Sequence, residues 1–235
     1  MNARSNDVAA ALTEAARAIH RTRSVEDTLD AIVRAAQDAV PGMDHVGISV
    51  THRDGKIETL AGSDQLVWDL DALQYDLNEG PCVSSITEDP VMVVEHAGQD
   101  QRWPNYMPQA VKSGLRSQLG LRLYTDEETL GGLNLYSTES ETISADAVEI
   151  AELFATHAAI ALDRARHEHQ LNEALVTRKV IGQAIGLIMQ RYQIDEDRAF
   201  HFLVRASTTS NIKLRAVAEE VVDTANREFS PRHQD

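Results

Sequence analysis

The sequence predicts an α+β domain built around an antiparallel sheet, followed by a long helix that leads into an all-α bundle of three helices. Three observations carry this prediction. Between residues 45 and 136, short apolar stretches are separated by turn signals, as in strands joined by hairpins. From 146 to 191 there is no proline, and apolar residues recur at helical spacing. Two further segments with one apolar face each follow that stretch.

Composition restricts the class of protein. The 235 residues allow one or two domains, and 43% hydrophobic with 25% charged residues is ordinary for a globular protein. No apolar run reaches the roughly 18 residues of a membrane helix, and residues 1–7 lack a signal-peptide core. The single cysteine, Cys82, excludes an intrachain disulfide framework and a cysteine-based zinc cluster. We therefore expect a cytoplasmic protein with no contact to a membrane.

The first 40 residues are predicted to form two helices. An N-terminal helix is expected within 1–24, and a second helix is expected to end at Pro41-Gly42, which cannot continue it. The apolar face of the first consists of Val8, Leu12, Ala15 and Ile19, and that of the second consists of Leu29, Ile32, Val33 and Ala36.

Extended chain follows these helices. Apolar and small or polar residues alternate over 46–51, and Asp54-Gly55 is a strong hairpin turn before 56–61. A short strand is expected at 91–94, and a second hairpin joins 119–124 to 130–136. Hairpin strands with helices before and between them indicate an α+β domain around an antiparallel sheet.

The region 146–191 can form ~45 residues of continuous helix, roughly 68 Å long. A single globular domain rarely needs so long a helix, so we expect it to join two domains. Polar residues interrupt its apolar seam, so any coiled coil is short. Asp195 can cap the next helix, which is expected to end near 207, and the last helix is expected over 213–228.

The charge is distributed unevenly along the chain. The whole chain carries −15, and residues 1–165, with 12 Lys and Arg against 27 Asp and Glu, account for all of it. Residues 166–235 are neutral, and the stretch 178–215 has 7 basic against 3 acidic residues. A partner with phosphates is therefore plausible for the C-terminal part and implausible for the N-terminal part.

The C-terminal part has a characteristic pattern of residues. A run of small residues lies in one predicted helix, and particular residues follow at fixed intervals in the next two helices. These are Ala174-Leu175, Thr177-Arg178, 181–189, Ala199-Phe200, Leu203, Ser207, 211–214 and Val217-Ala218. Over about 166–228 the combination resembles the ANTAR domain, the three-helix module of bacterial transcription antitermination regulators. The resemblance implies an RNA-binding output. Ile185 departs from the family pattern, which often has lysine there.

The N-terminal part resembles a GAF domain of the type attached to ANTAR modules in actinobacteria. The residues that carry this resemblance are 59–64, Leu70-Asp71, Gln74-Tyr75, 79–82, 102–104, Arg116-Ser117 and 132–136. It implies a sensory or dimerising module, and because the signature of cyclic-nucleotide-binding members is missing, it implies no cyclic nucleotide. The predicted domains are an N-terminal helix at 1–24, a GAF-like sensor at 25–165, an ANTAR RNA-binding domain at 166–228 and a tail at 229–235.

The basic residues between 178 and 215 are the main functional candidates. RNA hairpin loops are recognised through phosphate contacts by Arg and Lys and through hydrogen bonds to unpaired bases. The alternative is that these arginines are merely solvated, that Gly182 and Gly186 permit tight helix packing, and that Asn211 is a helix N-cap. Met189, Phe200 and Leu203 are expected in the core. The predicted RNA-binding residues are Arg178, Gln183, Gly186, Arg191, Arg198, Ser207, Asn211, Lys213 and Arg215.

Three residues of the sensor are candidates for ligand or redox chemistry. Cys82 follows Gly80-Pro81 and could open a helix, a position that lowers a thiol pKa; the alternative is a small buried residue. Tyr75 and Trp103 could line a small-molecule pocket or pack against the sheet. No nucleophile–base pair, phosphate loop or metal-ligand cluster is recognised, so no enzyme, catalytic residue, metal or cofactor is expected.

The sequence therefore predicts a GAF sensor that controls an ANTAR output, which binds hairpins in nascent RNA. The expected partners are these RNA hairpins, a second copy of the chain through the N-terminal helices and 146–181, and an unidentified small molecule or signalling protein at the sensor. One alternative is a helix-turn-helix DNA-binding module that reads DNA with the helix from Lys213, although Glu219, Glu220 and Asp223 would repel phosphates. A dimerising adaptor without nucleic-acid affinity is the other.

Overall fold

A computed structural model of the chain describes residues 13, 25–52, 54–126 and 128–229, with only the backbone at 169, 228 and 229. The helix predicted within 1–24 and nearly all of the predicted tail lie outside the described residues. The described part divides into two compact units, the first ending at Ala165 and the second beginning at Arg166.

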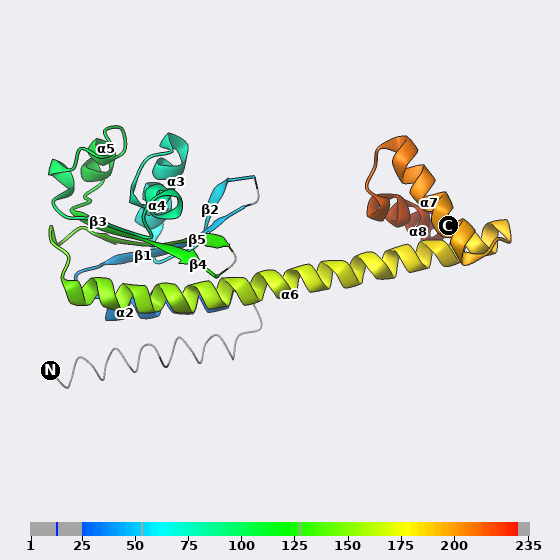
Figure 1. Cartoon of the computed structure of the whole chain (residues 1–235), viewed down its shortest axis with the longest axis horizontal. Helices are drawn as coiled ribbons and strands as arrows, with labels where there is room; N and C mark the ends of the chain where they lie inside the picture. The colour runs from blue at the N-terminus through cyan, green and yellow to red at the C-terminus, as the bar shows by residue number, and fades with distance from the viewer. Residues whose placement is uncertain (1–12, 14–24, 53, 127, 230–235) are drawn as a thin grey trace, which may run out of the picture. The chain divides into compact units, whose positions relative to one another are not determined.

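The first unit is built on a five-stranded antiparallel sheet with the strand order β2-β1-β5-β4-β3 (Figure 1). Both predicted hairpins are present, and Gly55 takes the positive φ of 84° that its turn requires. The strands are β1 (His45–Thr51), β2 (Ile57–Gly62), β3 (Val91–Val94), β4 (Ser117–Tyr124) and β5 (Thr129–Ser137).

Helices cover both faces of this sheet (Figure 1). Helix α2 (Val25–Ala39) and the first part of α6 (Ala145–Tyr192) lie on one face, where the predicted apolar face of α2 is buried against leucines of β4 and β5. The other face carries α3 (Gln65–Leu77), α4 (Pro81–Thr87), the 3-10 helix η1 (Ala97–Gln99) and α5 (Met107–Lys112).

The two-sided cover explains why the strands are more buried than an alternating pattern predicts. In β5 every residue after Thr129 is buried. Leu133 and Leu135 face the core under α2 and α6, whereas Tyr136 belongs to the core under α3 and α5. Polar residues that would face water in a one-sided sheet, such as Asn134, are therefore enclosed by protein.

The second unit consists of the end of α6 with α7 (Glu196–Ser210) and α8 (Leu214–Phe229). The positive φ of Gln193 follows the end of α6, and Asp195 caps α7 by accepting a hydrogen bond from the Arg198 N–H at 2.9 Å. Its buried core consists of Ala184, Ile188, Ala199, Leu203 and Ala218. The architecture is the predicted one, an α+β sheet domain followed by a long helix and a three-helix arrangement.

One core prediction is wrong for α7. Phe200, expected in the core, is 40% exposed, because the buried face of the helix is centred on Ala199 and Leu203. Among the described helices, none has a stretch long and apolar enough to cross a lipid bilayer.

Candidate functional site

Most basic side chains of the second unit are available to a partner. Seven lie between 178 and 215, and all except Arg215 are exposed. Within the described part of the chain, five of the seven form no salt bridge. A polyanion could bind these five without first displacing a carboxylate. They are Arg178, Lys179, Arg191, Arg205 and Lys213.

The other two arginines are paired with acidic residues. Arg215 lies 2.8 Å from the Glu219 carboxylate and 3.4 Å from that of Glu173, and the hydrogen bond to Glu219 raises its pKa. Arg198 lies 3.7 Å from Asp195, but three quarters of its side chain is exposed. Arg198 can therefore turn to an RNA phosphate more easily than Arg215 can.

The glycines of α6 do not pack against another part of the described chain. A Cβ added at Gly182 or Gly186 would meet no atom within 4 Å, and Gln183 between them is exposed. Ala184, in contrast, is fully buried in the core. The two glycines therefore do not have the packing role considered from sequence, and the helix surface at both positions is open.

Ser207 and Asn211 shape the connection between α7 and α8. The Ser207 hydroxyl donates a hydrogen bond to the carbonyl of Ile212 at 2.6 Å. Asn211 ends α7 in the left-handed region with φ of 55°, so it is a C-cap and not the N-cap considered from sequence. Lys213 immediately precedes α8, and its carbonyl accepts the first helical hydrogen bond, from Val217.

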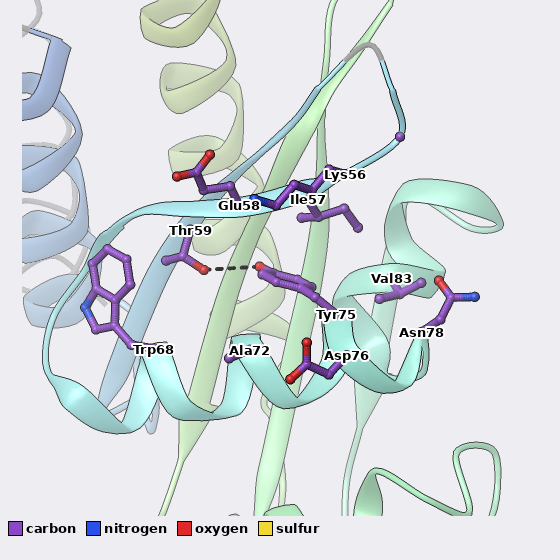
Figure 2. A pocket seen from close by; sticks show the side chains of 11 residues that line it. Lys56, Ile57, Glu58, Thr59, Trp68, Ala72, Tyr75, Asp76, Asn78 and Val83 are labelled. Atoms are coloured by element: carbon purple, nitrogen blue, oxygen red, sulfur yellow. Dashed lines mark hydrogen bonds between the residues drawn. The ribbon is translucent and has the colours of Figure 1, made fainter.

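The first unit has a pocket of about 460 Å³ between β2 and α3 (Figure 2). Tyr75 and Trp68 extend from α3 toward β2, and the Tyr75 hydroxyl lies 3.3 Å from the Thr59 hydroxyl. Lys56, Glu58 and Asp76 add charges to the lining. The pocket offers two aromatic surfaces together with donors and acceptors, which suits a small polar aromatic or amphipathic molecule.

A fully buried carboxyl group lies behind this pocket. The Asp71 carboxyl accepts hydrogen bonds from the Thr59 hydroxyl at 2.7 Å, from the Asn134 amide at 2.9 Å and from the Tyr136 hydroxyl. Burial raises its pKa to about 6, although these hydrogen bonds act in the opposite direction. Thr59 contacts both Asp71 and Tyr75, so it links the pocket to the buried carboxyl.

Cys82 lies at the second position of α4, as the sequence suggested, but its thiol is fully buried. Its sulfur lies 3.7 Å from the Ser49 hydroxyl and 3.8 Å from the Tyr75 hydroxyl. Burial, together with the charge of Asp71, raises the pKa of the thiol to about 12. The lowered pKa considered from its helix position is therefore reversed, because burial outweighs the field of a seven-residue helix.

The structure separates the two aromatic residues that the sequence grouped. Tyr75 lines the pocket, whereas Trp103 is buried under the sheet and donates its indole N–H to Ser84 at 3.1 Å. Trp68 was missed, although its spacing from Ala72 and Tyr75 along one helical face could have indicated it. In the second unit, sequence reasoning found no signal for Tyr192 and Phe202, which are exposed, whereas Arg205 belongs to the basic stretch that it indicated.

Comparison with known proteins agrees with this division. The family model of the GAF domain matches residues 22–163, and that of the ANTAR domain matches residues 169–222. Both matched domains are regulatory, and neither match identifies a catalytic domain. No curated protein matches the chain.

Solved GAF domains share the fold of the first unit. The GAF domain of a phosphoenolpyruvate-protein phosphotransferase from Coxiella burnetii is 17% identical with a TM-score of 0.58, over 72% of this chain and 99% of that one. The corresponding domain from Acinetobacter is 17% identical with a TM-score of 0.54, over 71% and 96%. A phycocyanobilin-bound GAF domain of a cyanobacterial phytochrome is 17% identical with a TM-score of 0.54, over 69% and 97%.

Proposed function

Because the chain belongs to the GAF domain family and carries an ANTAR domain after it, we propose that it is a transcription antitermination regulator of the actinobacterial type, with an output that binds hairpins in nascent RNA. The ANTAR domain implies an RNA-binding antitermination output, and the GAF domain implies a sensory input. RNA bound in this way holds a hairpin that competes with a terminator, so that transcription continues.

The observation that supports this proposal best is the set of five basic side chains in the second unit that form no salt bridge with any described residue. Arg178 and Arg191 lie in sequence on either side of the open glycines Gly182 and Gly186, where an RNA backbone can approach closely. Lys213 adds a charge at the start of α8, next to backbone N–H groups that also favour phosphate. Gln183 between the two glycines and Arg198 on α7 complete the proposed surface, and Arg215 contributes only where RNA displaces its carboxylates.

The sensory input is proposed to be a small molecule in the pocket beside Tyr75, or a signalling protein at the same unit. The pocket is large enough for a small ligand, and Trp68 in its lining provides an optical probe. Ligand binding should therefore change the fluorescence of Trp68. The change should be lost in Trp68→Phe and kept in Trp103→Phe, since Trp103 does not line the pocket.

We also propose that two copies of the chain associate through α6. Leu153, Ile160 and Leu171 are exposed on this helix at spacings that place them along one stripe. A dimer would present two RNA-binding units, and two linked units bind a two-hairpin RNA more tightly than either unit alone.

The decisive experiment is a mobility-shift titration of the full chain with a two-hairpin RNA and with duplex DNA of equal length. The variant Arg178→Ala, Arg191→Ala, Lys213→Ala should lose most RNA affinity and reduce the slope of log affinity against log salt by up to about 2. The control removes three exposed basic residues from the first unit, Arg34, Lys112 and Arg116. It carries the same charge change and should retain RNA affinity.

Two outcomes would contradict the proposal. Preference for duplex DNA would favour a helix-turn-helix module, a reading that Glu219, Glu220 and Asp223 on α8 oppose. Absence of binding to either nucleic acid would favour a dimerising adaptor.

A further inference from the structure

The second unit has a largely apolar groove whose lining includes one residue of the proposed RNA surface, Arg191. It measures about 640 Å³ and lies among the end of α6, α7 and α8. The side chains of Ile188 and Leu203, which belong to the buried core, line part of it, and the exposed rings of Tyr192 and Phe202 line another part. The groove therefore offers aromatic surface to a ligand from solution.

Two aromatic rings meet at this groove although they come from different helices. The ring centroids of Tyr192 and Phe202 are 5.6 Å apart, and their planes are inclined by 34°. Tyr192 is 54% exposed and Phe202 is 48% exposed, so each residue still offers aromatic surface to solvent. The short connection after Tyr192, with Gln193 in the left-handed region and Asp195 capping α7, brings the two helices together at this point.

Basic side chains accompany these rings. Arg191 lines the groove itself and forms no salt bridge within the described residues. Arg198 and Arg205 lie four residues before and three residues after Phe202 on α7, so they share its helical face. An exposed ring between two arginines is suited to an aromatic group that is attached to phosphates on both sides.

One carboxylate at the groove narrows the class of ligand. Glu220 of α8 lines it and has no hydrogen-bond or ion-pair partner among the described residues. A carboxylate disfavours a phosphate inside the groove but accepts hydrogen bonds from an exocyclic amino group, while Arg191 can donate to ring or carbonyl acceptors. A nucleobase is a planar ring that carries both an amino donor and ring or carbonyl acceptors on its edges.

We propose that this groove, formed by Tyr192, Phe202, Arg191 and Glu220, holds one unpaired base of an RNA hairpin loop by stacking. The inference rests on the proposed function, because it assigns the part of the RNA that this second unit reads. The phosphates on either side of the base would meet Arg198 and Arg205. Adenine, cytosine and guanine, which carry an amino group, are expected in preference to uracil.

The test uses an RNA selected by the full chain from a library of two-hairpin molecules with randomised loops. Each loop nucleotide of the selected RNA is replaced in turn by the fluorescent base 2-aminopurine and by an abasic nucleotide. At one loop position, binding should quench 2-aminopurine through stacking, and the abasic change should weaken binding by about 5- to 150-fold. Uracil at that position should also weaken binding.

Protein variants then locate the stacking site. Tyr192→Leu with Phe202→Leu keeps apolar volume but removes the rings, and it should abolish both the quenching and the extra cost of the abasic position. The slope of log affinity against log salt should stay unchanged, since no charge is removed. Phe200→Leu is the matched control, because Phe200 is an exposed aromatic residue of the same helix that does not line the groove.

Each result decides between the two proposals. If the full chain selects no RNA, the proposed function fails and this inference fails with it. If RNA binds but the double leucine variant keeps its affinity and quenching, the base site is refuted while the proposed function stands. If that variant folds by circular dichroism but changes only the sedimentation coefficient, the groove is an interface between copies and the inference is overturned.

A variant that fails to fold is replaced by Tyr192→Phe with Glu220→Gln. This replacement should reduce the discrimination against uracil, and unchanged discrimination refutes the base site.

Discussion

Asp71 and Cys82 show how burial changes the chemistry of single residues in the GAF unit. Both are fully enclosed between the sheet and α3 and α4, and burial raises the pKa of the carboxyl to about 6 and that of the thiol to about 12. A thiol in this state is mostly protonated at neutral pH and is a poor nucleophile. The structure therefore favours a packing role for Cys82, and it makes Asp71 the titratable group of interest near neutral pH.

The stability of the GAF unit should fall as the pH rises from 4 to 6. The folded state holds the Asp71 proton more tightly than the unfolded state does. The stability that this proton contributes is therefore fully present below the unfolded pKa, and it is lost as the pH rises through the folded pKa. A rise from about 4 to about 6 corresponds to roughly 3 kcal/mol. Asp71→Asn should remove this component of the pH dependence.

Denaturant unfolding followed by tryptophan fluorescence measures this effect, because Trp68 and Trp103 both lie in the GAF unit. Asp76→Asn, an exposed change on the same helix, is the control and should retain the wild-type pH profile. Identical profiles for wild type and Asp71→Asn would show that Asp71 titrates normally.

Helix α6 carries the exposed apolar stripe through which we propose that two copies of the chain associate. Its face toward the sheet consists largely of alanines, including Ala151, Ala155 and Ala158, which are buried. Its exposed stripe carries Leu153, Ile160 and Leu171, which are 45%, 55% and 63% exposed. Large apolar side chains so exposed along one helix are typical of a surface that a partner covers.

Charges placed on this stripe should dissociate the proposed dimer. Ile160→Glu with Leu171→Glu places like charges opposite each other in a parallel pair, and we expect a shift from dimer to monomer at micromolar concentration in sedimentation. Gln170→Glu with Asn172→Glu adds the same charge beside the stripe and should leave the dimer intact. A wild-type protein that sediments as a monomer, or a dimer that withstands the first variant, would contradict the prediction.

The uneven distribution of charge along the whole chain should affect how strongly the protein attracts RNA. Residues 1–165 carry −15, whereas the ANTAR unit is neutral with a basic stretch. An acidic domain in the same chain lowers the local potential that RNA experiences, and salt screens this effect over about 10 Å at 0.1 M.

Residues 166–235 alone should therefore bind a single RNA hairpin more tightly than the full chain at 50 mM salt. This fragment has a hydrophobic core of its own, around Ile188 and Leu203. The difference should be several-fold at low salt and should narrow toward 300 mM, since screening removes the repulsion. Titrations of both proteins across this salt range measure it, and a difference that does not depend on salt would rule out an electrostatic origin.

Local patterns were sufficient to predict the order and type of most elements. Three local signals are examples: the Asp54-Gly55 turn, the lack of proline from 146 to 191, and the cap at Asp195. Each depends only on residues that are near one another in sequence, and the structure has the turn, the long helix and the cap that they predict. Helices α3 and α5 were not placed individually, because their short apolar faces give weak periodicity. The basic stretch of the second unit was likewise visible, because charge can be counted along a sequence.

The environment of each side chain was decided only by tertiary structure. Arg215 was predicted as an RNA contact, but Glu173, 42 residues away, lies beside it, and no local pattern indicates such a pair. Cys82 begins a helix as expected, but only the sheet and α3, which bury it, decide between the two alternatives in favour of a small buried residue. The approach of Tyr192 to Phe202 depends on a three-helix arrangement. Sequence therefore determined the elements and their charge, since these depend on near neighbours, whereas burial and pairing depend on residues that only folding brings together.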